Sequence, residues 1–382
     1  MGPLHGVKIV EMSNIGPAPF CAMLLADLGA DVIRVSRLST TDLGFDIEPR
    51  FDVLNRSKQA VAVDLKSPDG VALVKQLVAG ADMLIEGFRP GVMERLGLGP
   101  DVCQAINPRL VFGRLTGWGQ QGTMAHMAGH DINYISMVGA LAAIGEKGGP
   151  PVAPLNLVGD FAGGSLYLAM GLLAALVEAR QSGQGQVIDA AMVDGVASLM
   201  AMHLGYRQAG MWHIARGTNT VDGGAPYYTT YETRDGKFMA VGSVEKRFYK
   251  LMVEGIGLSL ETLPDQDDQS HWDELRATIA ARFRAKTRDE WAATFANSDA
   301  CVTPVLDMDE CLVHPVTVER GVFAQRDGVV GPAPAPRFSR TPASVRSGVI
   351  DPNAGSRAAL RNWGISEAVI DDLAAKAVIP PG

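Results

Sequence analysis

The chain has 382 residues, a formal net charge of −8, a hydrophobic fraction of 47%, 43 glycines and 22 prolines. This composition is typical of a folded, loop-rich enzyme and excludes fibrous and disordered proteins. The length suits two domains or one large domain with an insertion, and the acidic balance disfavours nucleic acid as a partner.

Neither a membrane span nor a secretion signal is expected. The longest apolar run, residues 165–177, is shorter than the roughly 20 residues that a bilayer span needs. The N-terminus has no basic region followed by a long apolar stretch. The four cysteines are far apart and form no CxxC pair, which disfavours zinc and favours a reducing compartment. We therefore expect a cytoplasmic protein with no metal site.

The first 120 residues predict a parallel β-sheet. Predicted strands cover residues 7–11, 31–36, 59–65, 81–88 and 109–115. A predicted helix at residues 18–28 joins the first two strands, and this βαβ unit implies that they run parallel. The fold class is therefore α/β, with a Rossmann-like large domain whose ligands bind at the carboxyl ends of the strands.

The rest of the chain predicts a second domain. Residues 160–180 predict a long buried helix, and residues 189–204 predict another. The pattern then changes to short strands and turns followed by amphipathic helices. We expect a large domain at residues 1–204, a smaller α+β domain at 205–325, and a Pro-rich strap with terminal helices at 326–382.

The first βα turn, "SNIGPAP", has one glycine and two prolines. A dinucleotide-binding fingerprint needs several glycines so that the backbone can approach a pyrophosphate. A tight turn with proline at a helix start is therefore the expected structure, and a nicotinamide enzyme is a distant alternative.

Basic residues recur near the ends of predicted strands. They are Arg34, Arg37, Arg56, Lys58, Lys66, Arg89, Arg95 and Arg114. Each one singly is typical of solvated surface charge, but their joint placement suits a ligand with several phosphates.

Two side chains on different elements suit acid–base chemistry. His130 lies in "AGHDINYIS", where Asp131 could orient its ring, and Asp160 precedes a strongly apolar helix. Asp160 alone is typical of a helix N-cap, which is the simpler interpretation of that residue. Two bases on opposite sides of one carbon would instead suit a 1,1-proton transfer. Histidine as a class titrates near neutral pH, and a desolvated aspartate approaches that range.

The motifs "AGHDINYIS", "PLNLVGDFAGGS" and "EGFRPGVMERLGLG" resemble the α-methylacyl-CoA racemase branch of the class III CoA-transferase (formyl-CoA transferase-like) superfamily. The resemblance covers nearly the whole chain. It implies epimerisation of 2-methylacyl-CoA thioesters through an enolate, with no metal or redox cofactor. Coenzyme A is then part of the substrate and not a separate cofactor. It also implies an interlocked homodimer in which the C-terminal strap returns to the large domain.

The same resemblance assigns the site residues. His130 and Asp160 correspond to the two bases, and Glu245 to a glutamate of the small domain that pairs with the histidine. Lys246 departs from the family pattern, which has proline after that glutamate. The positions that correspond to coenzyme A contacts are Arg37, Val63, Asp64, Leu65, Lys66, Gly87, Phe88, Arg89, Arg95, Gly129, Asp131, Ile132, Asn133 and Tyr134.

Two other functions remain open from the sequence. In a true CoA-transferase of this superfamily, Asp160 would attack the thioester as a covalent nucleophile. His130 favours the racemase, because the transferases usually carry another residue before the following aspartate. A non-catalytic acyl-CoA-binding protein would need no paired bases.

Overall fold

The computed structural model describes residues 2–38 and 47–381, which form two compact units. Unit 1 comprises the chain up to residue 138, residues 155–199 and the chain from residue 318 on, and unit 2 comprises residues 139–154 and 200–317. The units differ from the expected domain boundaries at 204 and 325 mainly because residues 139–154 group with unit 2.

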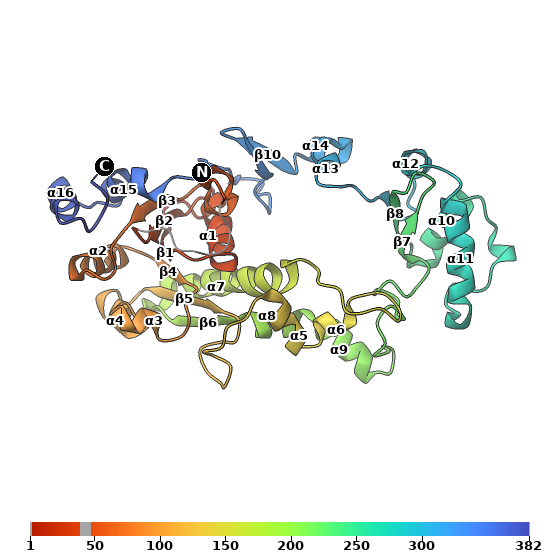
Figure 1. Ribbon diagram of the computed structural model, residues 1–382, viewed down its shortest axis with the longest axis horizontal. Helices are drawn as coiled ribbons and strands as arrows, with labels where there is room; N and C mark the ends of the chain where they lie inside the picture. Colours follow the sequence, from red (N-terminus) through yellow and green to blue (C-terminus); the bar gives the residue numbers. More distant parts are fainter. Residues whose placement is uncertain (1, 39–46, 382) are drawn as a thin grey trace. The chain divides into compact units, whose positions relative to one another are not determined.

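Unit 1 contains a six-stranded parallel sheet in the order β3-β2-β1-β4-β5-β6 (Figure 1). Its strands are β1 (Lys8–Met12), β2 (Asp31–Ser36), β3 (Gln59–Ala62), β4 (Met83–Glu86), β5 (Val111–Thr116) and β6 (Val187–Ala191). The strand order is that of a doubly wound Rossmann sheet, so the predicted α/β class with a parallel sheet is confirmed.

The start of the predicted helix at residues 189–204 is wrong. Residues 187–191 form strand β6, which pairs in parallel with β5, and the helix begins only at Met192. A short apolar run with β-branched residues fits either a helix or a strand. Residues 187–191 become a strand because the free edge of β5 supplies hydrogen-bond partners.

Helices cover both faces of this sheet. Those of unit 1 are α1 (Pro17–Asp27), α2 (Pro68–Ala79), α3 (Val92–Arg95), α4 (Pro100–Ile106), α5 (Asp131–Met137), α7 (Tyr167–Ser182), α8 (Met192–Leu199), α15 (Pro352–Asn362) and α16 (Glu367–Ala375). Short 3₁₀ turns η1 (Pro49–Phe51) and η2 (Val53–Asn55), the π-helical segment η3 (Leu157–Leu166) and the hairpin β10 (Phe323–Arg326) and β11 (Val329–Pro332) complete the unit.

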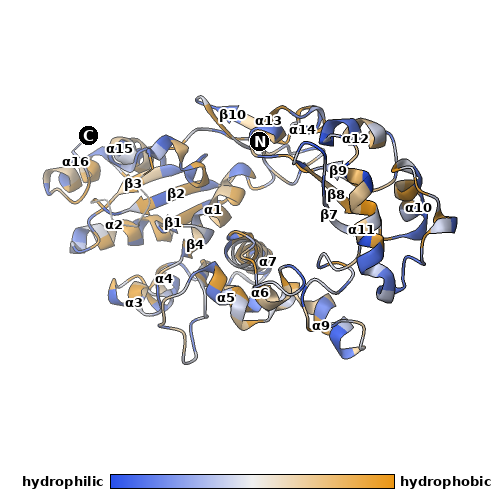
Figure 2. Cartoon of the chain, turned by 45° about the vertical axis from the view of Figure 1, so that its right-hand side comes forward, coloured by the Kyte–Doolittle hydropathy of each residue, from blue (hydrophilic) through white to orange (hydrophobic). Residues whose placement is uncertain are grey.

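The alternation of side chains along each strand makes two apolar cores. In β1, Val10 and Met12 pack with residues of α2, α15 and α16, whereas Ile9 packs with residues of α1 and α7 on the other face. Successive side chains of a strand point to opposite faces, so a strand buried on both faces is mostly apolar on both, and a charge within it needs a partner. Figure 2 shows this apolar colouring in β1 and β2.

The first βα turn has the predicted form. Gly16 has φ 68°, a left-handed value that favours glycine, and Pro17 is the first residue of α1. Proline at this position loses no hydrogen bond, because the first N–H groups of a helix have no partner inside the helix.

Three of the basic residues found by sequence are buried in ion pairs. The Lys58 Nζ atom lies 2.7 Å from Glu11 Oε2, and both side chains are at most 1% exposed. Arg56 pairs with Asp27 at 2.6 Å, and Arg114 is buried as well. Burial raises the pKa of Glu11 and lowers that of Lys58, although each charge opposes the shift of the other. These cations stabilise the fold and are not available to a ligand.

The C-terminal residues return to the sheet of unit 1. Helix α15 packs against β3, where Ser356 Oγ accepts a hydrogen bond of 2.9 Å from the Ala62 amide (Figure 1). The Asp64 amide donates to the Val378 carbonyl at 2.8 Å. This end of the chain therefore covers the β3 edge and supports the loop that follows β3.

One continuous helix, Leu157–Ser182, passes from η3 into α7. By length and composition alone it could cross a membrane, a test that the core helix of a globular protein also passes. It packs on α1, α8 and β5, yet it is less buried than the sequence predicts. Leu166, Met170 and Val177 are 50%, 59% and 58% exposed.

Unit 2 is built on the antiparallel sheet β7-β8-β9. Its elements are β7 (Tyr228–Glu232), β8 (Phe238–Gly242), β9 (Val302–Pro304), α6 (Ala140–Ala143), α9 (Ala201–Gln208), α10 (Lys246–Gly255), α11 (Trp272–Phe283), α12 (Arg288–Phe295) and α13 (Glu310–Val313), with turns η4 (Leu260–Thr262) and η5 (Gln269–His271). Helix α14 (Pro315–Arg320) leads back into unit 1. An aromatic core that includes Tyr231, Phe283 and Trp291 holds the unit together.

We predict that Lys58→Met lowers the free energy of unfolding by roughly 3–5 kcal/mol, because it leaves the Glu11 carboxylate buried without its partner. Urea denaturation followed by circular dichroism measures this change. The double variant Glu11→Leu/Lys58→Met is the control and should recover most of the loss, because it buries no charge. Equal losses in the single and double variants would contradict the prediction.

Candidate active site

Predicted ligand-binding residues follow three strands of the sheet. Arg37 follows β2, residues 63–66 follow β3, and residues 87–89 follow β4. Because the strands are parallel, their carboxyl ends lie at one edge of the sheet, and the loops leave from the same side. The structure therefore brings these sequence-distant segments to one edge.

A cavity of about 520 Å³ lies beside this edge. Its lining comprises Leu65, Lys66, Pro68, Val71, Ala72, Lys75, Arg95 and Leu96. Three of these, Leu65, Lys66 and Arg95, are positions that the resemblance assigns to coenzyme A. Lys75 was missed by the sequence analysis, since on helix α2 it looks like any solvated lysine. The cations Lys66, Lys75 and Arg95 suit a phosphate-bearing ligand.

An ionic network centred on the buried Arg114 links the end of β4 to helix α3 and so holds the segment that carries Arg89 and Arg95. The Arg114 Nε atom donates to Glu86 Oε1 at 2.8 Å, and its Nη1 atom donates to Glu94 at 2.7 Å. Glu86 also accepts a 2.6 Å hydrogen bond from the Phe88 amide. Burial raises the pKa of Glu86 to about 7, against the opposing effect of the Phe88 amide and of Arg114. Arg114 thus anchors this loop at both ends, which explains why it is buried.

His130 occupies the residue before helix α5. Its amide donates to the Asn133 side chain at 3.0 Å, and its own side chain is exposed. The Tyr134 hydroxyl donates to the Gly129 carbonyl, and the Tyr134 ring meets Trp118 edge-on at 4.9 Å. The segment 129–134 is therefore a fixed turn in which Ile132 and Asn133 are exposed with His130, whereas Asp131 and Tyr134 are buried.

Asp160 does not cap its helix, so the simpler interpretation of this residue is wrong. It lies inside the first turn of η3, where its Oδ2 atom accepts a 3.1 Å hydrogen bond from the Asn156 side chain. The carboxylate that accepts from backbone amides there is Asp131, which bonds the amides of Gly159 and Asp160. The capping residue thus comes from another helix, a partner that the sequence does not reveal.

The environment of Asp160 favours its protonated form. Burial raises the pKa of this carboxyl; the Asn156 hydrogen bond lowers it, the Asp131 charge raises it further, and His130 opposes the rise. Asp131, the residue after His130, accepts a hydrogen bond of 2.8 Å from the Asp160 amide, so the backbones of His130 and Asp160 lie close together. The first βα turn lies here too, because a Cβ atom on Gly16 would be 3.7 Å from Asp160 Oδ2. The structure therefore brings His130 and Asp160 together at two neighbouring helix starts.

Asp131 does not hold the His130 ring as the sequence suggested. Its Oδ2 atom is bonded to the two backbone amides of η3, and its Oδ1 atom has no hydrogen-bond partner among the described residues. The role expected for Asp131 in orienting the imidazole is therefore wrong.

Glu245 lies in unit 2, immediately before helix α10. Lys246, where the family pattern has proline, is the first residue of α10, and this is a position that either residue can occupy. The nearby Cys301 thiol has its pKa raised by burial and by the charge of Glu245. The pairing of Glu245 with His130 stays a prediction.

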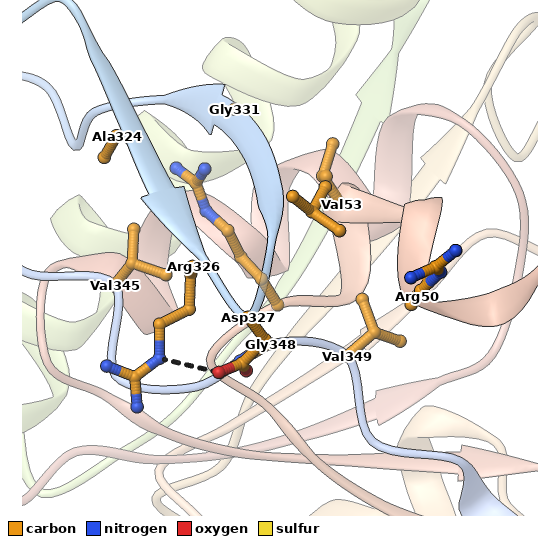
Figure 3. A pocket seen from close by; sticks show the side chains of 11 residues that line it. Arg50, Val53, Ala324, Arg326, Asp327, Gly331, Val345, Gly348 and Val349 are labelled. Carbon is orange, nitrogen blue, oxygen red and sulfur yellow. Dashed lines mark hydrogen bonds and ion pairs between the residues drawn. The ribbon is translucent and has the colours of Figure 1, made fainter.

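A second, much smaller pocket of about 70 Å³ lies elsewhere in unit 1 (Figure 3). Residues of η1, η2, the β10–β11 hairpin and the segment 345–349 line it. Arg56 at this pocket is held by Asp27 through two hydrogen bonds, and Arg326 lies 3.7 Å from Asp327. Arg56 is one of the basic residues that the sequence singled out, but its charge is paired with Asp27, and we assign the pocket to the packing of the hairpin on unit 1.

Comparisons with known proteins agree on one family. The profile of "CoA-transferase family III" matches residues 4–357. The chain is 46% identical to the alpha-methylacyl-CoA racemase of Mus musculus, covering 95% of this chain and 94% of the mouse protein. It is also 46% identical to the enzyme of that name from Homo sapiens, covering 89% and 87%. A CAIB/BAIF family protein from Brucella suis superimposes with a TM-score of 0.81 at 26% identity, covering 95% and 99%.

We predict that Arg95→Ala weakens the binding of free coenzyme A about tenfold, because a charge-assisted hydrogen bond to phosphate is worth roughly 1.5–3 kcal/mol. Isothermal titration calorimetry at fixed ionic strength measures the dissociation constant. Arg109→Ala is the matched control, since Arg109 is an exposed arginine just before β5, at the opposite edge of the sheet. An unchanged dissociation constant in Arg95→Ala would remove this cavity from the ligand site.

Proposed function

The chain belongs to CoA-transferase family III, and we propose that it interconverts the (R) and (S) forms of 2-methylacyl-CoA thioesters. The observation that carries this proposal is the 46% identity to alpha-methylacyl-CoA racemases over most of the chain. The hydrogen bonds of Asp131, which join the helix starts that carry His130 and Asp160, support it, because epimerisation at one carbon needs two proton carriers.

In the proposed reaction, one base breaks the C2–H bond and the electron pair moves onto the thioester oxygen as an enolate. The second base then delivers a proton to the opposite face of C2, so that the carbon is inverted and no other bond changes. His130 and Asp160 take these two roles. A carboxylate whose pKa is raised by burial is a stronger base than a solvated one, which suits Asp160 to a weakly acidic α-proton. Proton transfer of this kind calls for no metal or redox cofactor.

The runner-up is a CoA-transferase in which Asp160 attacks the thioester carbon and expels the CoA thiolate. The family name includes such enzymes, and the same partly buried carboxylate could serve either reaction. His130 favours the racemase, because a nucleophilic aspartate needs no second base on the other side of the substrate. A protein that only binds acyl-CoA has no use for either base.

We further propose that unit 1 binds coenzyme A at Arg37, residues 63–66, 87–89 and 129–134, and Arg95. Lys66 and Arg95 line the cavity beside the sheet edge, which supports this assignment. Arg56, Lys58 and Arg114 are excluded from it by their buried ion pairs.

The working form is proposed to be an interlocked homodimer in which unit 2 of one chain brings Glu245 to His130 of its mate. Three exposed apolar side chains, Leu166, Met170 and Val177, along α7 and at its start support a protein partner for this helix. These residues are spaced four and seven positions apart, as on one face of a helix, and exposed apolar surface on one face is typical of interfaces between subunits. A second copy of the chain is the partner that the resemblance to the family implies.

We predict that incubation of a single-epimer 2-methylacyl-CoA with the protein in deuterated water yields both epimers with deuterium at C2. The label arises because each base exchanges its proton with solvent between turnovers. Mass spectrometry and chiral chromatography of the hydrolysed acyl group measure the two quantities.

His130→Ala should slow the exchange by roughly 10²–10⁴-fold, the contribution typical of a general acid–base group, while circular dichroism stays unchanged. The control is His5→Ala, since His5 lies in the N-terminal turn before β1. If the wild-type product keeps its α-hydrogen and an added carboxylate acceptor takes up CoA, the transferase assignment is correct instead.

We predict a dimer by light scattering after gel filtration, and a shift toward monomer when Met170 and Val177 are both changed to Glu, because two charges would be buried in the interface. Val102→Glu is the control, as Val102 is an exposed apolar residue on α4. A monomeric wild-type protein with full activity would rule out the proposed dimer.

A further inference from the structure

The carboxylate of Asp131 joins the two helix starts that carry the proposed bases. Its Oδ2 atom accepts hydrogen bonds of 2.6 Å from the Gly159 amide and 2.8 Å from the Asp160 amide. Amides in the first turn of a helix have no partner within that helix, so the acceptor has to come from elsewhere. Asp131 follows His130 directly. Its side chain therefore connects the helix start that carries His130 to the helix start that carries Asp160.

The contact depends on glycine at position 159. A Cβ atom there would lie 2.7 Å from Asp131 Oδ2 and 2.9 Å from the Asp131 Cγ atom, closer than real Cβ atoms approach. Asp131 is only 5% exposed, and Gly159 is buried. The bond is therefore largely shielded from solvent, and one buried carboxylate links the two helix starts.

The other groups around Asp160 leave Asp131 as the main source of like charge. Asn156 is neutral, His130 opposes the rise in pKa, and the Tyr134 hydroxyl lies close enough to respond to the Asp160 charge. Helix α1 presents Gly16 and Pro17 to this region, and α8 packs Met192 and Val196 on the glycines of η3. Arg89 acts on Tyr134 from the loop after β4.

We propose that Asp131 is a positioning residue: it fixes the backbone of Asp160 relative to His130 and adds its negative charge to the site, without touching the reacting carbon. The inference rests on the proposed racemase function, because it concerns the distance between two bases that act on one substrate. Neither motif shows this pairing, since Asp131 and the amides that it binds are 28 and 29 residues apart.

Two variants separate the geometric and electrostatic parts of the role. Asp131→Asn keeps an oxygen acceptor but removes the charge. It should lower the pKa of Asp160 and so move the acid limb of the kcat profile to lower pH by roughly one unit. Asp131→Ala removes the acceptor, and kcat should fall about 10–100-fold because the Asp160 carboxylate is no longer held in place. Exchange of the amides in residues 157–164, measured by hydrogen–deuterium exchange, should accelerate in Asp131→Ala.

Asp82→Asn is the matched control. Asp82 also accepts a backbone N–H, from Lys8 at 2.8 Å, but it lies just before β4, at the opposite edge of the sheet. Its pH profile and the exchange of residues 157–164 should equal those of the wild type.

An unmoved acid limb in Asp131→Asn, or normal kcat and normal amide exchange in Asp131→Ala, would overturn the inference. If Asp131→Ala does not fold, the position of the acid limb in the kcat profile of Asp131→Asn still tests the inference. Wild-type protein that places no label at C2 refutes the proposed function instead. Accelerated amide exchange in Asp131→Ala would then still support the anchoring of η3.

Discussion

All six strands of unit 1 run in the same direction, and this constraint gives the site its location. Every loop that leaves a strand starts at one edge of the sheet, so residues separated by tens of positions meet there. The loops after β2, β3 and β4 carry Arg37, Lys66 and Arg89. Burial of the strands on both faces, with apolar side chains alternating between two cores, anchors the strands from which these loops leave.

The basic residues that are buried in ion pairs are not available to a ligand, whereas the exposed ones are. Lys58, Arg56 and Arg114 are each paired with a carboxylate, because a lone charge in the interior is far more costly than a paired one. Arg37, Lys66, Arg89 and Arg95 are exposed. The division follows from depth in the fold, because position in the sequence does not separate the paired residues from the exposed ones. Arg114 still affects the ligand site indirectly, because it holds the loop that bears Arg89 and Arg95.

Glycines in "GDFAGGS" allow the close approaches that assemble the site. Gly159 admits the Asp131 carboxylate, and a Cβ atom on Gly163 would collide with Val196 of α8. The helix that begins here can therefore lie against its neighbours while its start carries Asp160. A proton-transfer enzyme and a covalent transferase can share this arrangement, because both need a carboxylate held at a helix start. In the proposed function, His130 is the residue that distinguishes the two reactions.

Hydrophobic periodicity and turn residues were enough to predict the parallel α/β sheet and the turn at Pro17. Local patterns carry that information because strand alternation and the proline at a helix start are properties of adjacent residues. The pairing of His130 with Asp160 came from the family resemblance and stays a prediction. The sequence could not separate β6 from a helix, tell the buried Lys58 from the exposed Lys66, or identify Lys75 at the cavity. It also assigned the cap of η3 to Asp160, whereas Asp131 from another helix supplies it. These features were decided by tertiary structure alone, because strand pairing, burial and long-range hydrogen bonds depend on partners distant in the chain.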